Sequence, residues 1–363
     1  MTIKTNKYQI RFFRVGNGSK GGDAILITLY DDNDTPHLVL IDGGYKETGE
    51  SIVKHLKMVY STPVIDIIFN THPDRDHISG LLPVVNDTSI TINYLAFNRP
   101  WKDAGFTNDF FRDKRITPYS LMERIRDSFQ YADELEESAK KRQIEMLPIA
   151  TGLSYFNGII QVLSPTKEFY TSHLLLSEKT PDSIFEELNK VFVHKECEEE
   201  DYTSGNGPIE WFEEEVTSPI NETSAIITLI LGNMKFLFTG DAGKEALRDA
   251  INYFKEKSNL PKDAKMNFTR LQLPHHGSRK NIDPSILDTI SASTYIISCP
   301  PKGEKEGHPS RRLINKILEM NPKARIFTTA SCSSFVFYEG LNLNLNIQQP
   351  AKISKKMDGK EKS

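Results

Sequence analysis

Short apolar runs, separated by turn residues, dominate the N-terminal part of the chain. Gln9–Val15, Ala24–Tyr30 and His37–Ile41 have the alternation and β-branched content of strands, and turns rich in Gly or Asp separate them. Val64–Phe69 is an almost continuous apolar run, which is typical of a strand buried on both faces. We therefore expect a sheet, with a helix over Gly49–Tyr60 between its third and fourth strands.

The C-terminal half alternates strand and helix patterns. The predicted strands are Ser224–Leu231, Met234–Thr239, Arg270–Leu273, Thr294–Ser298 and Arg325–Thr328. The predicted helices are Lys244–Glu256, Ser285–Thr289 and Ser310–Met320. Such alternation favours an α/β fold in which helices cover a largely parallel sheet.

The middle of the chain has a different pattern. Helical periodicity covers Leu121–Lys141, and a helix-like acidic stretch covers Asp182–Glu200. Two short strand patterns interrupt the helical ones, at Gly152–Tyr155 and Ile159–Leu163. We expect one domain over 1–349, with 97–220 as an inserted helical cap, and a disordered tail over 350–363 because Lys, Asp and Gly dominate there.

Composition excludes several classes of protein. The chain has 363 residues and a net charge of −4, so a globally basic surface for nucleic acid is absent. Its three cysteines are far apart, which argues against a disulfide framework or a cysteine-type zinc site. The N-terminus lacks a signal-peptide pattern, and no apolar run is long enough to span a membrane. We expect a cytoplasmic protein with no membrane partner.

Histidine and aspartate gather at the ends of predicted strands. His72, Asp74, Asp76 and His77 directly follow the buried run Val64–Phe69. Five of the nine histidines lie in three short motifs, which contain His72 and His77, His275 and His276, and His308. Imidazole and carboxylate groups together suit Zn²⁺, Mn²⁺ or Fe, and a richness in carboxylates favours harder cations. The alternative for the first motif is a polar surface loop.

These motifs carry a family resemblance. Thr71–Gly80 resembles the H-x-[HD]-x-D-H signature of the metallo-β-lactamase superfamily, and its Asp version is similar to the hydrolase domain of ComEC-type competence channels. Further matching segments are Arg14–Gly18, Gly22–Ala24, Leu40–Gly44, Phe238–Asp241, Leu273–Ser278 and Gly307–Pro309. The resemblance covers about 12–98 and 221–340, and it implies an αββα sandwich of the metallo-β-lactamase fold.

The resemblance also implies a set of metal ligands. His72 and Asp74 would hold one cation, Asp76 and His77 the other, and Asp241 would bridge the two. His276 would be the last ligand of the second cation and His275 a proton donor, although these two roles are open to exchange. Many members of the superfamily place a third histidine before the bridging aspartate, where this chain has Asn221–Ser224. We expect two divalent cations, Zn²⁺ or Mn²⁺, with a one-cation site as the alternative.

The implied chemistry is hydrolysis by a metal-activated hydroxide, because a divalent ion lowers the pKa of bound water to about 7. The catalytic residues would be Asp76, which orients the hydroxide, and His275 or His308, which protonates the leaving group. Asp42 would orient a ligating histidine, or it is an ordinary turn residue. Ser278, Arg279 and Lys280 lie at a predicted helix start, where backbone amides and cationic side chains would bind the substrate phosphate. The alternative is that they are ordinary solvated residues.

Three functions remain open from the sequence. The first is a nuclease or phosphodiesterase that acts on nucleic acid or another phosphodiester. The second keeps the fold and the metal but acts on a different ester, such as a phosphorylcholine ester, a lactone or a thioester. The third is a subunit of a multi-component system whose activity is gated by a protein partner encoded by a neighbouring gene.

Overall fold

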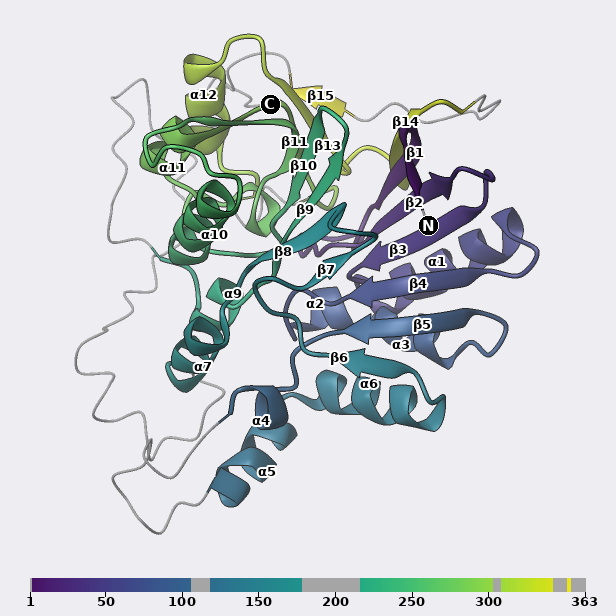
Figure 1. Ribbon diagram of the computed structural model, residues 1–363. Coiled ribbons are helices and arrows are strands. Elements are labelled where there is room, and N and C mark those ends of the chain that lie inside the picture. The colour runs from purple at the N-terminus through teal and green to yellow at the C-terminus, as the bar shows by residue number, and fades with distance from the viewer. Residues whose placement is uncertain (1, 106–117, 178–215, 303–307, 342–350, 354–363) are drawn as a thin grey trace.

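Two mixed β-sheets lie face to face, and helices cover the outer face of each sheet (Figure 1). This arrangement comes from a computed structural model, which describes residues 2–105, 118–177, 216–302, 308–341 and 351–353. The predicted acidic stretch Asp182–Glu200 lies outside the described residues, and so does most of the predicted tail.

The first sheet combines an antiparallel half with a parallel half. Its spatial order is β14-β1-β2-β3-β4-β5-β6. The strands are β1 (Ile3–Phe13), β2 (Ile25–Asp31), β3 (Pro36–Ile41), β4 (Val64–Phe69), β5 (Thr91–Ala96), β6 (Glu145–Leu147) and β14 (Ser334–Glu339). Pairing is antiparallel from β14 to β3 and parallel from β3 to β6, so β3, β4, β5 and β6 end at the same edge of the sheet.

The second sheet has a similar mixed character. Its order is β15-β13-β12-β11-β10-β9-β8-β7. The strands are β7 (Ser154–Tyr155), β8 (Ile160–Ser164), β9 (Ile226–Leu231), β10 (Met234–Phe238), β11 (Met266–Gln272), β12 (Ile290–Ile297), β13 (Arg325–Thr328) and β15 (Ala351–Ile353). The run from β10 to β13 is parallel, so the carboxyl ends of β10 and β11 lie side by side.

Helices form the two outer layers. On the first sheet lie α1 (Lys46–Val59), α3 (Leu81–Asn86), α5 (Pro118–Ser128) and α6 (Gln130–Lys141). On the second sheet lie α10 (Lys244–Lys257), α11 (Pro284–Thr289) and α12 (Arg311–Met320). The remaining described helices are α2 (Arg75–Ile78), α4 (Pro100–Asp103), α7 (Lys167–Leu175), α9 (Pro219–Glu222) and the 3₁₀ turn η2 (His275–Gly277).

Three hydrophobic cores hold the four layers together. Leu40 and Leu81 belong to the core beneath α1 and α3, whereas Val39 and Phe236 belong to the core between the sheets. The third core lies between the second sheet and its helices. Neighbouring residues of β3 thus face different cores, which explains why its sequence is apolar at successive positions. The predicted αββα sandwich is confirmed.

The segment 97–220, which the sequence predicted to be an inserted helical cap, contains strands as well as helices. Its segment 145–147 forms β6 at the edge of the first sheet, and the two predicted short strands form β7 and β8 in the second sheet. The predicted helix Leu121–Lys141 is divided at Phe129 into α5 and α6, and α6 packs on α3 as part of the outer layer. The described part of 97–220 thus contributes strands to both sheets as well as helices, and its role as an inserted cap stays a prediction. Ala351–Ile353, assigned to the tail, forms β15 against β13.

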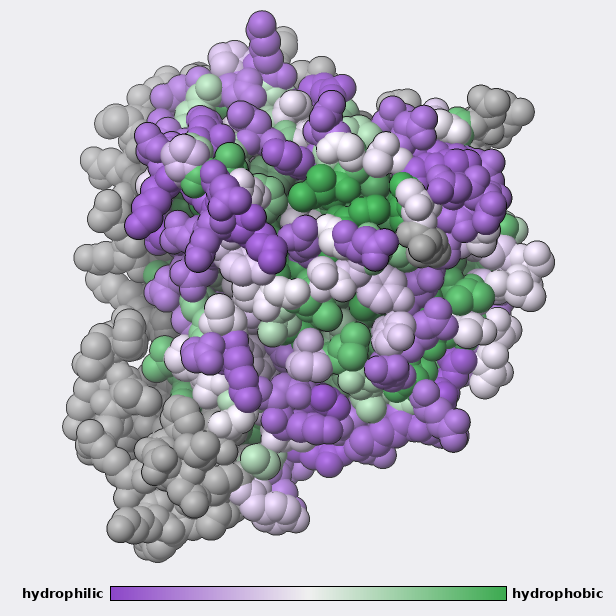
Figure 2. All heavy atoms as spheres, viewed as in Figure 1, coloured by the Kyte–Doolittle hydropathy of each residue, from purple (hydrophilic) through white to green (hydrophobic). Residues whose placement is uncertain are grey.

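Polar side chains cover most of the face seen in Figure 2, with smaller hydrophobic areas among them. None of the described helices combines the length and the apolar character needed to cross a bilayer.

Glycine contacts hold the loop after β4 against the end of β3. A Cβ on Gly80 would lie 1.9 Å from the carbonyl oxygen of Gly43, and a Cβ on Gly43 would lie 2.5 Å from the backbone of Gly80. The Gly43 amide also donates to the His77 carbonyl at 2.8 Å. This close approach fixes the position of His77 relative to the first sheet.

Gly80→Ala is expected to lower the free energy of unfolding by about 2–3 kcal/mol, because the added methyl group meets backbone that cannot move aside. Urea denaturation of the two proteins measures the difference. Gly18→Ala is the matched control, since a Cβ at Gly18 meets no atom within 4 Å. Equal denaturation midpoints for Gly80→Ala and Gly18→Ala would contradict the proposed role of this contact.

Candidate metal centre

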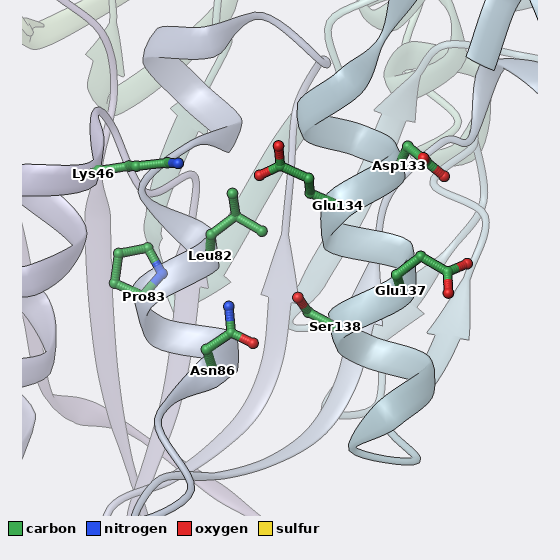
Figure 3. A pocket seen from close by; sticks show the side chains of 8 residues that line it. All are labelled: Lys46, Leu82, Pro83, Asn86, Asp133, Glu134, Glu137 and Ser138. Atoms are coloured by element: carbon green, nitrogen blue, oxygen red, sulfur yellow. The ribbon is translucent and has the colours of Figure 1, made fainter. Parts of the chain in front are cut away.

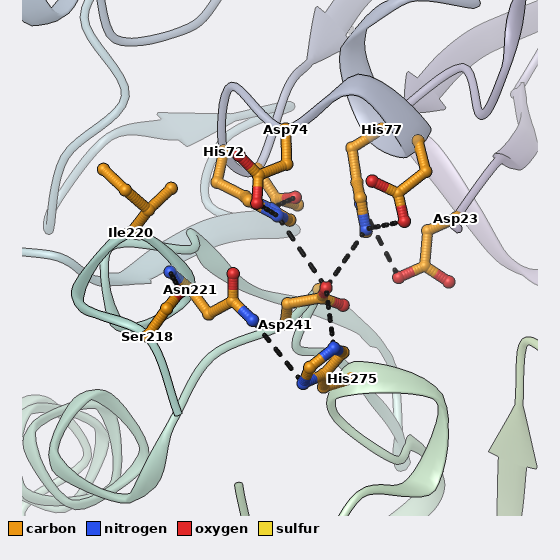
Figure 4. A network of polar contacts seen from close by, with 12 residues as sticks. Asp23, His72, Asp74, His77, Ser218, Ile220, Asn221, Asp241 and His275 are labelled. Carbon is orange, nitrogen blue, oxygen red and sulfur yellow. Dashed lines mark hydrogen bonds and ion pairs between the residues drawn. The ribbon is translucent and has the colours of Figure 1, made fainter. Parts of the chain in front are cut away.

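The predicted metal ligands come from strand ends in both sheets. His72, Asp74, Asp76 and His77 lie on the loop after β4 and on the short helix α2. Asp241 follows β10. The next strand, β11, leads into η2, which contains the two adjacent histidines. Because β3 and β4 are parallel, and β10 and β11 are also parallel, the four strand ends deliver these side chains to one region between the sheets (Figure 4).

The centre of this region is the carboxylate of Asp241. Its Oδ2 atom lies 3.4 Å from Nε2 of His77, 3.8 Å from Nε2 of His72 and 3.8 Å from Nε2 of His275 (Figure 4). The side chains of His72 and His77 are fully buried. His72 also lies 3.8 Å from Oδ2 of Asp74. The structure thus brings together the residues that the sequence predicted for the first cation and for the bridge.

Asp42 sets which ring nitrogen of His77 carries the proton. Its Oδ2 atom lies 2.8 Å from His77 Nδ1 and accepts a hydrogen bond from Thr71 Oγ1 at 2.6 Å. The carboxylate is fully buried, and only a donor can face it, so His77 is protonated on Nδ1. Nε2 of His77 then points at Asp241 and is the ring nitrogen left for a cation.

The same carboxylate sets the tautomer of His72 through Thr71. The hydroxyl proton of Thr71 is used by Asp42, so Thr71 Oγ1 accepts from Nδ1 of His72, which lies 3.1 Å away. This leaves Nε2 of His72 bare and directed into the site. The sequence predicted that Asp42 orients one ligating histidine. In the structure it orients two, His77 directly and His72 through Thr71.

His276 lies on the side of the site that contains Asp76. Its Nε2 atom is 3.9 Å from Oδ2 of Asp76, and Asp76, His77 and His276 form one group of closely placed ligand atoms. His275 belongs to none of the ligand groups found among the described residues, and its Nδ1 atom lies 3.2 Å from Oδ1 of Asn281. The geometry therefore favours His276 as the ligand and His275 as its neighbour.

The backbone around these two histidines is strained. His275 and His276 both have left-handed φ angles, of 46° and 57°, and Gly277 follows at 83°. Residues other than glycine rarely adopt this conformation, and such residues cluster at functional sites. The His275 amide donates to the Gly240 carbonyl at 3.1 Å, which ties this turn to the end of β10. The turn directs two consecutive side chains toward the same site.

The polar atoms that face the site lack hydrogen-bond partners. Among the described residues, these buried atoms include Nε2 of His72, Nε2 of His77 and Oδ1 of Asp241. The nearest carboxylate oxygens lie 3.4 Å from Nε2 of His77 and 3.8 Å from Nε2 of His72, which is too long for good hydrogen bonds. When two ligand atoms each lie about 2.1 Å from the same cation, the two atoms are roughly 3–4 Å from one another. The donor set and its spacing therefore fit a divalent cation.

An acidic cluster on α6 differs from the proposed metal centre in its partners. Asp133, Glu136 and Glu137 on α6 are also close together, and Asp133 and Glu137 line a pocket of about 500 Å³ beside α3 (Figure 3). Glu136 already has Arg99, Arg126 and Lys140 within 3.6 Å. This cluster has basic partners and no histidine, so it has no need of a cation.

Burial and neighbouring charges shift the pKa values of Asp241 and His77 in opposite directions. Burial raises the pKa of the Asp241 carboxyl, but the surrounding histidines outweigh it and hold this pKa well below its usual value. Burial lowers the pKa of His77, and the carboxylates of Asp241 and Asp42 reverse this, so the net shift is well upward. Burial and two neighbouring histidines lower the pKa of His308 to about 3.

The site opens into a cleft of about 480 Å³. Its lining includes Lys20, Tyr45, Arg75 and His308 together with the carboxylates of Asp74 and Asp76. The His308 ring lies 5.1 Å from the His275 ring, centroid to centroid. A second cleft, of about 660 Å³, is also lined by Tyr45 and Arg75, so the two clefts are adjacent.

The predicted phosphate-binding segment is placed differently. Ser278, Arg279 and Lys280 do not stand at a helix start, because α11 begins only at Pro284 and the Asp283 side chain caps it by accepting from the Ile286 amide. Ser278 and Arg279 are buried, and the Lys280 amide donates to the Ser278 hydroxyl. None of the three is among the residues that line the cleft, and only their placement at a helix start is wrong; their role in substrate binding stays a prediction.

Two further residues complete the description of the site. Asn221, at the position without a histidine, lies on α9 with its Nδ2 atom 3.5 Å from His275 Nδ1. Asp23, which the sequence analysis did not select, is buried and close to both Asp241 and His276. The only sequence signal for Asp23 was its place in the segment Gly22–Ala24, just before an apolar strand.

Comparisons with known proteins show a distant likeness in fold. No family model and no curated protein matches the chain. A metallo-β-lactamase-type protein from Thermotoga maritima is 12% identical over 65% of this chain and 79% of its own, with a TM-score of 0.31. A long-form RNase Z from yeast is 12% identical over 81% of this chain and 37% of its own, with a TM-score of 0.36. A metallo-β-lactamase from Hirschia baltica is 9% identical over 71% of this chain and 86% of its own, with a TM-score of 0.29.

Proposed function

We propose that this chain is a metal-dependent hydrolase that cleaves phosphodiesters. The observation that carries the proposal is the convergence of unpartnered imidazole and carboxylate atoms at the base of an open cleft. When bound, a divalent cation such as Zn²⁺ or Mn²⁺ would lower the pKa of a coordinated water to about 7. His72, Asp74 and Asp241 would hold one cation, and Asp76, His77, His276 and Asp241 would hold the other.

The chain's own residues divide the remaining work. Asp76 is a partly exposed carboxylate at the cleft, with a side chain 26% exposed, so it is placed to accept a proton from the attacking water. His275 lines the cleft, and Asn281 orients its ring, which would place that ring near the leaving group. The lowered pKa of His308 makes its ring neutral at pH 7, which favours hydrogen bonding to the substrate over donation of a proton by an imidazolium.

The charge of the cleft wall favours an anionic substrate. Lys20 and Arg75 line the cleft, and the Arg75 guanidinium lies over the rings of Tyr45 and Tyr131, at 5.8 and 5.9 Å from their centroids. Cationic and aromatic side chains together bind the phosphates and bases of single strands. The adjacent second cleft is lined by Tyr45 and Arg14, so a phosphodiester chain that passes Tyr45 would meet a further cationic side chain.

Lys20→Ala is expected to raise KM for an oligonucleotide by roughly two- to fivefold and to leave kcat unchanged, because an exposed cation contributes little binding energy. The slope of log KM against log salt should fall by about 0.7–0.9, as one phosphate contact is lost. Steady-state kinetics at several salt concentrations measure both quantities. Lys257→Ala, on the exposed end of α10, is the control. An unchanged salt slope would contradict a role for Lys20 in binding phosphate.

A substrate panel tests the proposed function itself. Purified protein with Mn²⁺ or Zn²⁺ is assayed on single- and double-stranded DNA, RNA, a bis-aryl phosphate, a phosphorylcholine ester, a lactone and a thioester. The proposal expects turnover of a phosphodiester to exceed turnover of the carbonyl esters. Faster turnover of a lactone or thioester would contradict it, and activity that appears only in a co-purified complex would favour the partner-gated alternative.

A further inference from the structure

Asp23 is a buried carboxylate without a partner. It precedes β2, and its side chain is 2% exposed. Among the described residues, neither of its oxygen atoms makes a hydrogen bond of ordinary geometry, and the Ser298 hydroxyl is the polar group beside it. The nearest basic atom, Nδ1 of His77, is 3.9 Å away and already bonds to Asp42 at 2.8 Å (Figure 4). A buried carboxylate in this position needs either a proton or a cation.

The surroundings of Asp23 supply other ligand atoms. One oxygen or nitrogen from each of Asp23, Asp241 and His276 lies within 4.8 Å of the others. Gly22 allows this approach, because a Cβ there would lie 2.0 Å from the carbonyl oxygen of Asp76. The loop before β2 therefore packs directly against the segment that carries Asp76, and Asp23 faces the same space as Asp241 and His276.

We propose that Asp23 is a ligand of the cation held by Asp76, His77, His276 and Asp241. This assignment rests on the proposed metal centre, and it makes the two cation positions unequal. The position beside Asp23 gains a further carboxylate, which favours a hard cation such as Mn²⁺ over Zn²⁺. The other position keeps only His72, Asp74 and the shared Asp241, because the chain has Asn221 where a histidine is common in the superfamily it resembles. The Asp23 position should therefore fill first.

Asp23→Asn tests the assignment, since it keeps the size of the side chain and removes its charge. Metal-free protein is titrated with Mn²⁺ by calorimetry. The wild type is expected to show one tight and one weaker equivalent. The variant should bind the tight equivalent at least about 100-fold more weakly, because loss of even an outer partner of a metal ligand costs about 10–100-fold in affinity.

The thermal midpoint without metal gives a second readout. Metal-free Asp23→Asn should melt at a higher temperature than the metal-free wild type, because an unpaired buried charge has been removed. Its midpoint should rise less on addition of Mn²⁺ than that of the wild type. Asp23→Ala, which removes the carboxylate without introducing a new polar group, is measured as well. If one of the two variants fails to fold, the other still tests the assignment.

Asp66→Asn is the matched control. Asp66 lies near the start of β4 and accepts from the Leu38 amide at 2.9 Å, far along the strand from His72. This variant should lose stability equally with and without Mn²⁺ and should keep the wild-type titration.

The outcomes separate two failures. Wild-type affinity and stoichiometry in Asp23→Asn or Asp23→Ala would overturn the role of Asp23. A wild-type protein that binds no divalent cation would overturn the whole centre, and the assignment of Asp23 with it. Binding that shows the expected difference, in a protein that hydrolyses no phosphodiester, would support Asp23 as a ligand and contradict only the proposed function.

Discussion

Asp241→Ala is expected to abolish hydrolysis, with kcat/KM falling by about a thousandfold or more. The Asp241 carboxylate lies near His72, His77 and His275 together, so its removal affects both proposed cation positions. A thousandfold loss corresponds to roughly 4 kcal/mol of transition-state stabilisation, which is within what a metal ion supplies. Kinetics on the best phosphodiester of the panel measure the loss.

The same variant should lose bound metal. Elemental analysis of wild-type and Asp241→Ala protein, prepared identically, is expected to show at least one cation fewer per chain in the variant. Asp263→Ala removes an exposed carboxylate from the loop after α10 and serves as the control for activity and metal content. Full activity of Asp241→Ala in a preparation free of contaminating nuclease would remove the basis of the proposed mechanism.

Asp42→Asn is expected to have the second largest effect. The Asp42 carboxylate accepts from four donors, which are the Asn70 amide group, the Thr71 backbone amide, the Thr71 hydroxyl and Nδ1 of His77. Asparagine offers one acceptor oxygen and turns its amide protons toward two of these donors. His72 and His77 would then lose the contacts that leave their Nε2 atoms bare, and metal affinity should fall by about 10–100-fold.

Excess metal distinguishes the lowered metal affinity of Asp42→Asn from the loss of a catalytic residue. Activity of Asp42→Asn should recover toward the wild-type value as Mn²⁺ is raised, because Asp42 acts on the ligands and not on the substrate. Thr71→Val offers a matched comparison, since it removes only the hydroxyl that links Asp42 to His72. Equal metal affinities in wild type and Asp42→Asn would show that Asp42 does not orient these histidines.

Apolar patterning predicted the elements that position the site. The runs that became β3, β4 and β10 are buried on both faces, so their sequences differ sharply from the turns that follow them. Polar residues placed after such runs had to lie at a strand end, and Asp42, His72 and Asp241 all do. The αββα layering followed from the same pattern together with the resemblance.

The middle of the chain was harder to predict because its strands are short. β6 has three residues and β7 has two, so neither contains enough residues for a period to be recognised. β5 and β14 were not predicted at all, and both depend on pairing with strands distant in the sequence. A short strand of this kind is stabilised by its partners rather than by its own residues.

Two features of the site depended on three-dimensional contacts. The sequence could not decide between His275 and His276, because their roles follow from two consecutive left-handed residues that direct the side chains differently. Asp23 is an isolated aspartate among glycines in the sequence, and only its burial beside Asp241 and His276 singles it out.

A crystal structure of the protein grown with Mn²⁺, with data collected across the manganese absorption edge, tests the central claim most directly. We expect anomalous peaks between the loop after β4 and the loop after β10, with Asp241 oxygens and the Nε2 atoms of His72 and His77 within about 2.0–2.4 Å of them. Absence of a peak there, or Asp241 lying remote from both histidines, would contradict the account.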